Sequence, residues 1–131
     1  MAEAIMNAEI SKRGMNARAD SCGLMAFEGS PANDFALRTL SDMGLDASGH
    51  SAKRINYALV RDSVVLCMEK PLKDAVSHMY PEASVFDLCA YSGVSGSIPD
   101  PYGFGEAAYS ACAEKLEVCI SKILDREGNG K

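Results

Sequence analysis

The feature that most constrains the fold is an apolar run, Ser63–Met68, which a helical stretch and a second strand-like segment follow. The run reads SVVLCM without a charged residue, which is typical of a strand that is covered on both faces. Lys70–Tyr80 predicts a helix, because Pro71 is tolerated in a first helical turn and Pro81 follows its end. Ser84–Leu88 predicts another strand. Strands that alternate with helices predict an α/β fold with a parallel sheet.

The rest of the chain adds further helices and one strand-like segment. Ala19–Gly23 is predicted to be strand-like, and residues 93–105 to be irregular, because glycine and proline recur there. Gly14 and Gly44 are placed to end the first two helices. The tail Glu127–Lys131 is polar, and we expect it to fray. Helices are predicted over residues 2–13, 33–43, 54–61 and 106–125.

Length and composition limit the classes of function. The chain has 131 residues, which is the size of one domain, so residues 1–131 are assigned to a single domain. Lys and Arg number 13 against 18 Asp and Glu, and without a basic cluster this net charge of −5 predicts no nucleic-acid partner. No apolar run is long enough for a membrane helix and no signal-peptide core follows Met1, so we expect no membrane partner and a cytoplasmic location.

The cysteines do not form a metal or disulfide pattern. They stand at positions 22, 67, 89, 112 and 119, without a Cys-x-x-Cys pair and with only two histidines in the chain. We therefore predict no metal site and no disulfide framework. Cys112 and Cys119 lie on one helix face, about 10 Å apart along the axis, and we interpret them as small core residues. Cys22, Cys67 and Cys89 are expected to be buried strand cysteines.

Five segments, in this order, resemble the low-molecular-weight protein tyrosine phosphatase family. The acid loop and the segment that ends in His50 are the specific ones, and the resemblance covers essentially the whole chain. The matching segments are Met1–Ile5, Asp20–Gly23, Gly44–His50, Leu66–Met68 with Leu72–Asp74, and Asp100–Gly103. The resemblance implies a three-layer α/β sandwich around a small parallel sheet of strand order 2-1-3-4.

One part of the family's pattern is missing from these 131 residues. The family's first strand ends in a Cys-x5-Arg-Ser loop ahead of its first helix, whereas no cysteine here has an arginine six positions later. We expect the strand and loop to be missing ahead of Met1, either because the given sequence starts too late or because a natural short form exists. The missing strand would lie between Ala19–Cys22 and Ser63–Met68. Three outcomes are open: the two segments pair directly, another chain pairs with the exposed strand edges as in a homo-oligomer, or the first segment becomes mobile. We expect pairing or association rather than an empty slot.

The resemblance assigns roles to four residues. Asp100 corresponds to the general acid, although an aspartate before a proline is also a common turn residue. Tyr102 corresponds to an aromatic wall for the substrate ring, followed here by Gly103 where the family often has a second aromatic. Ser21 and His50 correspond to residues that hydrogen-bond to the phosphate loop and brace it, and the alternative is a turn serine and a loop histidine.

The family's chemistry requires the missing loop. Its backbone N–H groups and its arginine hold the phosphate, and the same positive field lowers the pKa of the cysteine that attacks phosphorus. An aspartic acid then protonates the leaving group and afterwards activates water. We therefore expect the chain as given to be inactive. With the loop restored, its substrates would be phosphorylated proteins or small aryl phosphates, and no cofactor is implied.

Three other functions fit the sequence less well. A thioredoxin-coupled arsenate reductase needs a cysteine relay, but seven positions after Cys67 stands Asp74. A phosphatase-like binding domain without catalysis fits the length, but it gives Asp100 and Tyr102 little reason to occur together. Nucleotide binding is not expected either, because no glycine-rich fingerprint follows a strand.

Overall fold

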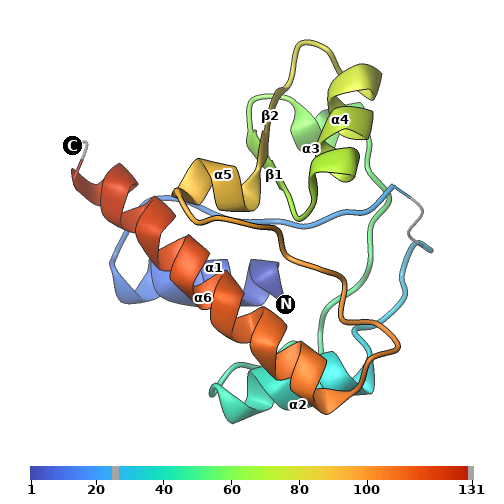
Figure 1. Cartoon of the computed structure of the whole chain (residues 1–131), viewed down its shortest axis with the longest axis vertical. Coiled ribbons are helices and arrows are strands. Elements are labelled where there is room, and N and C mark those ends of the chain that lie inside the picture. The colour runs from blue at the N-terminus through green and yellow to red at the C-terminus, as the bar shows by residue number, and fades with distance from the viewer. Residues whose placement is uncertain (25–26, 130–131) are drawn as a thin grey trace.

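The computed structural model describes residues 1–24 and 27–129. In Figure 1 the two strands lie with α3 and α4 at one end of the molecule and α2 lies at the other, while α6 runs along one side from α2 to the level of α5. The elements, in chain order, are α1 (Ala2–Lys12), α2 (Asp34–Asp42), α3 (Tyr57–Val60), β1 (Val64–Cys67), α4 (Lys70–Met79), β2 (Ser84–Asp87), α5 (Leu88–Ser92) and α6 (Glu106–Asn129).

The sheet is a parallel pair in which α4 connects β1 to β2. Val64 lies opposite Ser84, and the pairing continues to Cys67 opposite Asp87. Cys67, Val76 and Val85, one from each of the three elements, form a small buried cluster. The α/β class and the strand–helix–strand prediction are therefore confirmed.

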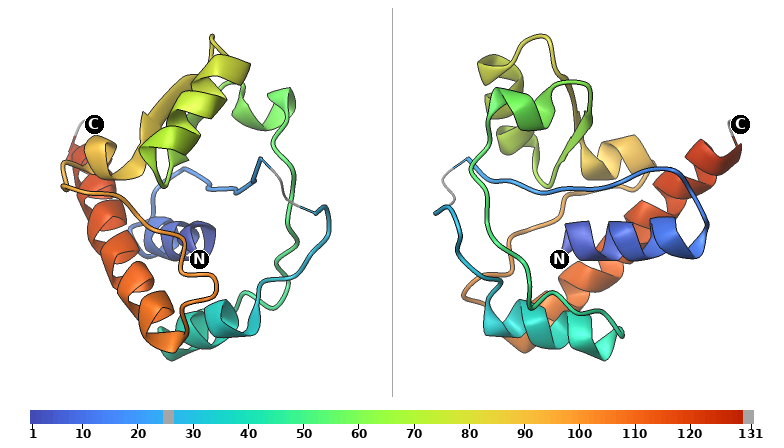
Figure 2. Two further views of the ribbon diagram at one scale, coloured as in Figure 1. Left: turned by 45° about the vertical axis from the view of Figure 1, so that its right-hand side comes forward. Right: turned by 180° about the vertical axis from the view of Figure 1, so that it is seen from behind.

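The main core forms where α6 lies against α1 and α2, as both views in Figure 2 show. An arginine just after α1 ties that helix to α6, because Arg13 bonds to Asp125 at 2.7 Å and to Ser121 at 3.1 Å. The most deeply buried apolar residues of this core include Ile5, Ile10, Leu40, Leu88, Leu116, Cys119, Ile120 and Ile123. Burial of Cys112 and Cys119 confirms that both are core residues.

The prediction of a strand at Ala19–Gly23 is wrong. Within the described residues this segment forms only a single parallel bridge, between Gly23 and Arg54, and β1 pairs only with β2. Its backbone groups find other partners: Asn7 binds both the N–H and the C=O of Ala19, and Gly23 donates to the carbonyl of Lys53 at 3.0 Å. Direct pairing of this segment with β1 does not occur, and association with another chain stays a prediction.

Helix α5 is an element that the sequence analysis missed. Asp87 caps its N-terminus by accepting a hydrogen bond from the Ala90 N–H at 2.9 Å, and Gly93 ends it at φ +80°. Cys89 is therefore buried on a helix rather than on a strand.

Three further expectations differ from the structure in detail. The helix predicted over residues 54–61 is shorter and covers only α3 (Tyr57–Val60), because Asn56 caps its start and Arg61 is already extended. Helix α6 continues to Asn129 instead of fraying at Glu127, and the last two predicted tail residues, 130 and 131, lie outside the described residues. Cys22 is exposed and not buried, since its segment joins no sheet.

Candidate active site

Three of the four predicted site residues line one cleft of about 690 Å³. Asp100, Tyr102 and His50 are brought to it by two loops, while the first turns of α1 and the N-terminal part of α2 contribute other walls. The cleft is acidic: Glu3, Asp46 and Asp100 line it, and the described residues that line it include no lysine or arginine. The fourth residue, Ser21, reaches this region through Glu3.

The loop that carries Asp100 is anchored just before the acid. Ile98 is almost fully buried, and its N–H donates to the carbonyl of Met68, just past β1, at 3.0 Å. From that anchor the chain turns outward, and Asp100 accepts a hydrogen bond from the Tyr102 N–H at 3.1 Å. Tyr102 lines the same cleft and is 73% exposed. The carboxylate therefore stabilises its own turn while remaining open to solvent.

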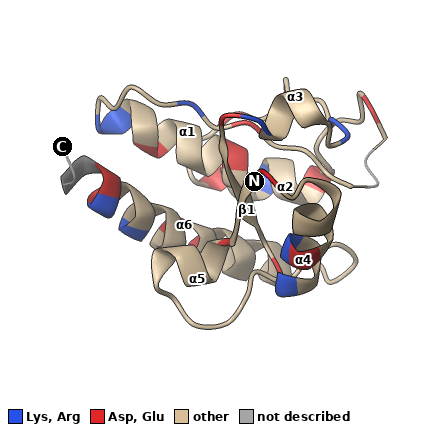
Figure 3. Ribbon diagram, turned by 90° about the horizontal axis from the view of Figure 1, so that it is seen from above, with Lys and Arg blue, Asp and Glu red and all other residues tan. Residues whose placement is uncertain are grey.

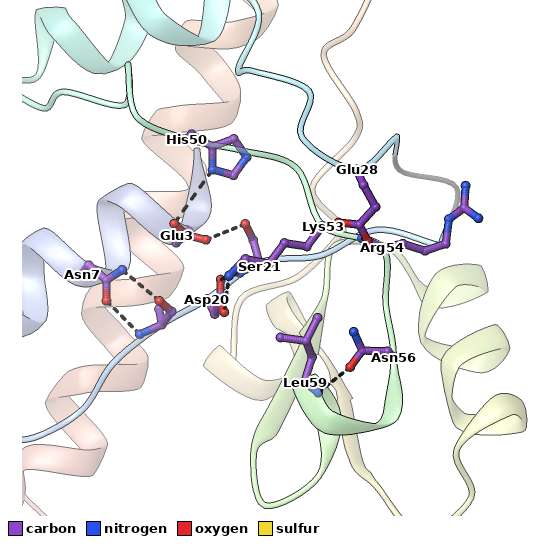
Figure 4. Close-up of polar contacts among 11 residues, drawn as sticks. Glu3, Asn7, Asp20, Ser21, Glu28, His50, Lys53, Arg54, Asn56 and Leu59 are labelled. Atoms are coloured by element: carbon purple, nitrogen blue, oxygen red, sulfur yellow. Dashed lines mark hydrogen bonds and ion pairs between the residues drawn. The ribbon is translucent and has the colours of Figure 1, made fainter.

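Glu3 joins the two residues that are expected to brace the phosphate loop. Ser21 Oγ donates to Glu3 Oε1 at 2.7 Å, and His50 Nδ1 lies 3.9 Å from Glu3 Oε2 (Figure 4). Sequence reasoning missed Glu3. Its only signal is an acidic residue in a first helical turn, which the helix dipole favours in any helix.

Hydrogen bonds from side chains, rather than pairing with a neighbouring strand, hold the segment that carries Ser21. The amide of Asn7 donates to the Ala19 carbonyl at 2.9 Å and accepts from the Ala19 N–H at 2.8 Å. Lys53 Nζ lies 2.8 Å from both carboxylate oxygens of Asp20. The hydrogen bond from Lys53 lowers the pKa of Asp20, and the same contact raises the pKa of Lys53. Figure 4 shows these contacts following one another along the segment.

A family model described as "Low molecular weight phosphotyrosine protein phosphatase" matches residues 1–128. The chain belongs to this family. A protein-arginine-phosphatase from Geobacillus stearothermophilus is 31% identical over 109 residues, which make up 81% of this chain and 74% of that protein.

Solved structures of the family share the fold. The crystal structure of a low molecular weight protein tyrosine phosphatase from T. tengcongensis is 32% identical, with a TM-score of 0.90 over 95% of this chain and 88% of that one. The arginine phosphatase from Geobacillus stearothermophilus is 26% identical, with a TM-score of 0.87 over 98% of this chain and 84% of that one.

Four of the five cysteines have a raised thiol pKa. Burial raises the pKa values of Cys22, Cys67 and Cys112, and burial together with the Cys119 thiol raises the pKa of Cys89 to about 11. A raised pKa keeps a thiol protonated and weakly nucleophilic at neutral pH. Cys89 and Cys119 lie with their sulfur atoms 3.9 Å apart in the core, and the cleft is lined by none of the five.

The described part of the chain shows neither a cluster of metal ligands nor a membrane-spanning helix. There, no group of three His, Cys, Asp or Glu side chains gathers closely enough to hold a metal ion. None of the described helices is long and apolar enough to cross a membrane.

Proposed function

We propose that this chain carries the acid and the supporting residues of a cysteine-dependent phosphatase that acts on phosphorylated proteins through a phospho-cysteine. The 131 residues alone are then inactive. The acidity of the cleft carries this proposal. Glu3 and Asp46 would repel a phosphate dianion, so binding requires an added cradle of N–H groups and an arginine. A Cys-x5-Arg loop supplies both the cradle and the thiolate.

Each supporting residue has a task in the proposed reaction. The thiolate of the loop attacks phosphorus, the bond from phosphorus to the leaving group breaks, and Asp100 gives its proton to the departing atom. Asp100 then accepts a proton from a water molecule whose oxygen attacks the phospho-cysteine, which releases inorganic phosphate and restores the thiolate. Tyr102 contacts the leaving side chain, while Ser21 and His50 hold the loop by hydrogen bonds.

The relatives suggest the substrate class, and the cysteines suggest the location. The relatives include a protein-arginine-phosphatase from Geobacillus stearothermophilus and a low molecular weight protein-tyrosine-phosphatase from Acinetobacter johnsonii, so phosphoarginine and phosphotyrosine proteins are both candidates. We propose a cytoplasmic location, and the five free cysteines support it because they fit a reducing compartment.

The test compares the chain as given with a chain extended by a strand and a Cys-x5-Arg-Ser-Pro loop ahead of Met1. Hydrolysis of an aryl phosphate is expected only from the extended chain. Asp100→Asn in that chain should lower kcat by about 10²–10⁴, with a smaller loss for substrates that have good leaving groups. The matched control is Asp42→Asn, an exposed acid on α2 outside the cleft, which should keep full activity.

Two results would contradict the proposal. Cysteine-dependent turnover by the 131 residues alone would show that one of their own thiols is the nucleophile. Full activity of the extended Asp100→Asn variant would place the acid elsewhere.

A further inference from the structure

A second groove, of about 950 Å³, lies between α4, β2, α5 and the C-terminal part of α6. We call it the basic groove and define it by Lys70, Lys73, Phe86, Tyr91 and Arg126. The candidate active site shares none of these residues. The proposed phosphatase reaction does not use them.

The charge of the basic groove is opposite to that of the chain. Lys70, Lys73 and Arg126 line it, in a chain of net charge −5. Figure 3 shows basic positions on α4 and toward the C-terminal end of α6. Neither lysine forms an ion pair with another described residue. Asp87 is the one acid in the lining, and it is turned inward: one oxygen caps the Ala90 N–H and the other is shielded from solvent. The lining of the groove therefore carries more positive than negative charge toward solvent, and the exposed acid Glu127 accepts a hydrogen bond from the Tyr91 hydroxyl at 3.3 Å.

Two aromatic rings also line the basic groove. The rings of Phe86 and Tyr91 are 4.8 Å apart and tilted by 44°. The Arg126 guanidinium lies 4.7 Å from the centre of the Tyr91 ring and donates to the Tyr91 carbonyl at 2.6 Å. Phe86 remains 40% exposed on β2. Exposed aromatic rings beside arginine are enriched where protein partners bind.

The shape and the charge favour one class of occupant. Lys70, Phe86 and Arg126 are exposed, so the groove is an open trough, whereas small ligands usually bury most of their surface in a deeper pocket. Three cations in an acidic chain are also few for a nucleic acid, whose binding depends on many phosphate contacts. We propose that the basic groove binds an acidic segment of a partner protein that carries an aromatic residue between its acids.

The probe for this proposal is a fluorescein-labelled peptide in which glutamates flank one phenylalanine, followed by fluorescence anisotropy. We expect saturable binding that weakens as salt rises to about 0.15 M, because exposed charges are screened. The variant Lys70→Glu/Lys73→Glu should raise the Kd by about tenfold or more. The matched control is Lys12→Glu/Lys122→Glu, which changes the net charge equally at exposed positions outside the groove and should leave the Kd within about twofold.

Four outcomes would overturn the proposal. They are the absence of saturable binding, unchanged affinity in the groove variant, an equal loss in the control variant, and tighter binding of a single-stranded oligonucleotide than of the peptide. Circular dichroism checks the folding of each variant. If the double variant does not fold, Lys70→Glu alone, at an exposed position, and Phe86→Ala give the same comparison.

Discussion

Replacement of Asn7 by alanine should loosen the segment that carries Ser21. The Asn7 amide forms two hydrogen bonds with Ala19, one to its N–H and one to its C=O, and both are partly buried. No strand neighbour is there to replace them, because Ala19–Cys22 joins no sheet within the described residues. In Asn7→Ala both backbone groups of Ala19 lose their partner.

The expected size of this effect can be worked out from the two bonds. Each contributes about 1 kcal/mol net to the free energy of unfolding, so their loss amounts to about 2 kcal/mol. Asn7 lies inside α1, where alanine is the better helix former by about 0.5 kcal/mol, which leaves a net loss of about 1.5 kcal/mol. For a chain of this size that loss lowers the Tm by about 5–8 °C.

Thermal unfolding followed by circular dichroism measures this change. Asn16→Ala is the matched control, since Asn16 is exposed and lies outside the helices; its free energy of unfolding should change by less than about 0.5 kcal/mol. An unchanged Tm in Asn7→Ala, or an equal fall in Asn16→Ala, would refute the argument that these two bonds hold the segment in place.

Three further predictions address charge, packing and thiol reactivity. Asp20→Asn removes the 2.8 Å pair with Lys53; because the hydrogen bond from Lys53 lowers the folded-state pKa of Asp20, the pair stabilises the fold above the unfolded-state pKa and is lost as pH falls through the folded-state pKa. Thermal scans from acid to neutral pH should show a difference of at most about 1 kcal/mol that disappears in acid. Ile120→Ala, at a side chain that is 1% exposed, should lower the free energy of unfolding by about 2–5 kcal/mol in urea titrations, and a loss well below that range would mean that α6 does not close the core. An aromatic disulfide reagent should label the exposed Cys22 first in the native chain, slowly because its pKa is raised, and should label the buried thiols, including Cys89 with its pKa of about 11, only after unfolding. Native-state labelling that persists in Cys22→Ser would contradict this.

The strand–helix–strand unit was predictable because its signals are local. An uncharged apolar run and a helix with Pro71 in its first turn are sufficient to define β1 and α4. Ala19–Gly23 was predicted to be strand-like although it contains Asp20 and Ser21. A strand also requires a hydrogen-bonding neighbour, and no local pattern reports whether one is present. Helix α5 was missed because five residues are too few for a helical period, although Asp87 and Gly93 mark its two ends.

The candidate site also contains residues that the sequence predicts and residues that only the structure reveals. The family motifs predicted that Asp100, Tyr102 and His50 belong together, and the structure brings them to one cleft. Glu3 could not be assigned its contacts with Ser21 and His50, because an acidic first-turn residue does not indicate which side chains approach it from elsewhere. The basic groove could not be predicted from the sequence either, because Lys70 and Arg126 come to line one groove only through tertiary packing.

The contact between α1 and α6 also bears on how the chain folds as it leaves the ribosome. Ile5 and Ile10 are buried against α6, and the Arg13–Asp125 bond spans 112 positions. Neither α1 nor α2 can bury its apolar face until the last described helix has been synthesised. Contacts between residues so far apart in the sequence cost loop-closure entropy and slow folding. The apolar residues of the α1 and α2 segments therefore stay exposed in the nascent chain until α6 has been synthesised. During that interval we expect chaperones that recognise apolar segments to bind the nascent chain.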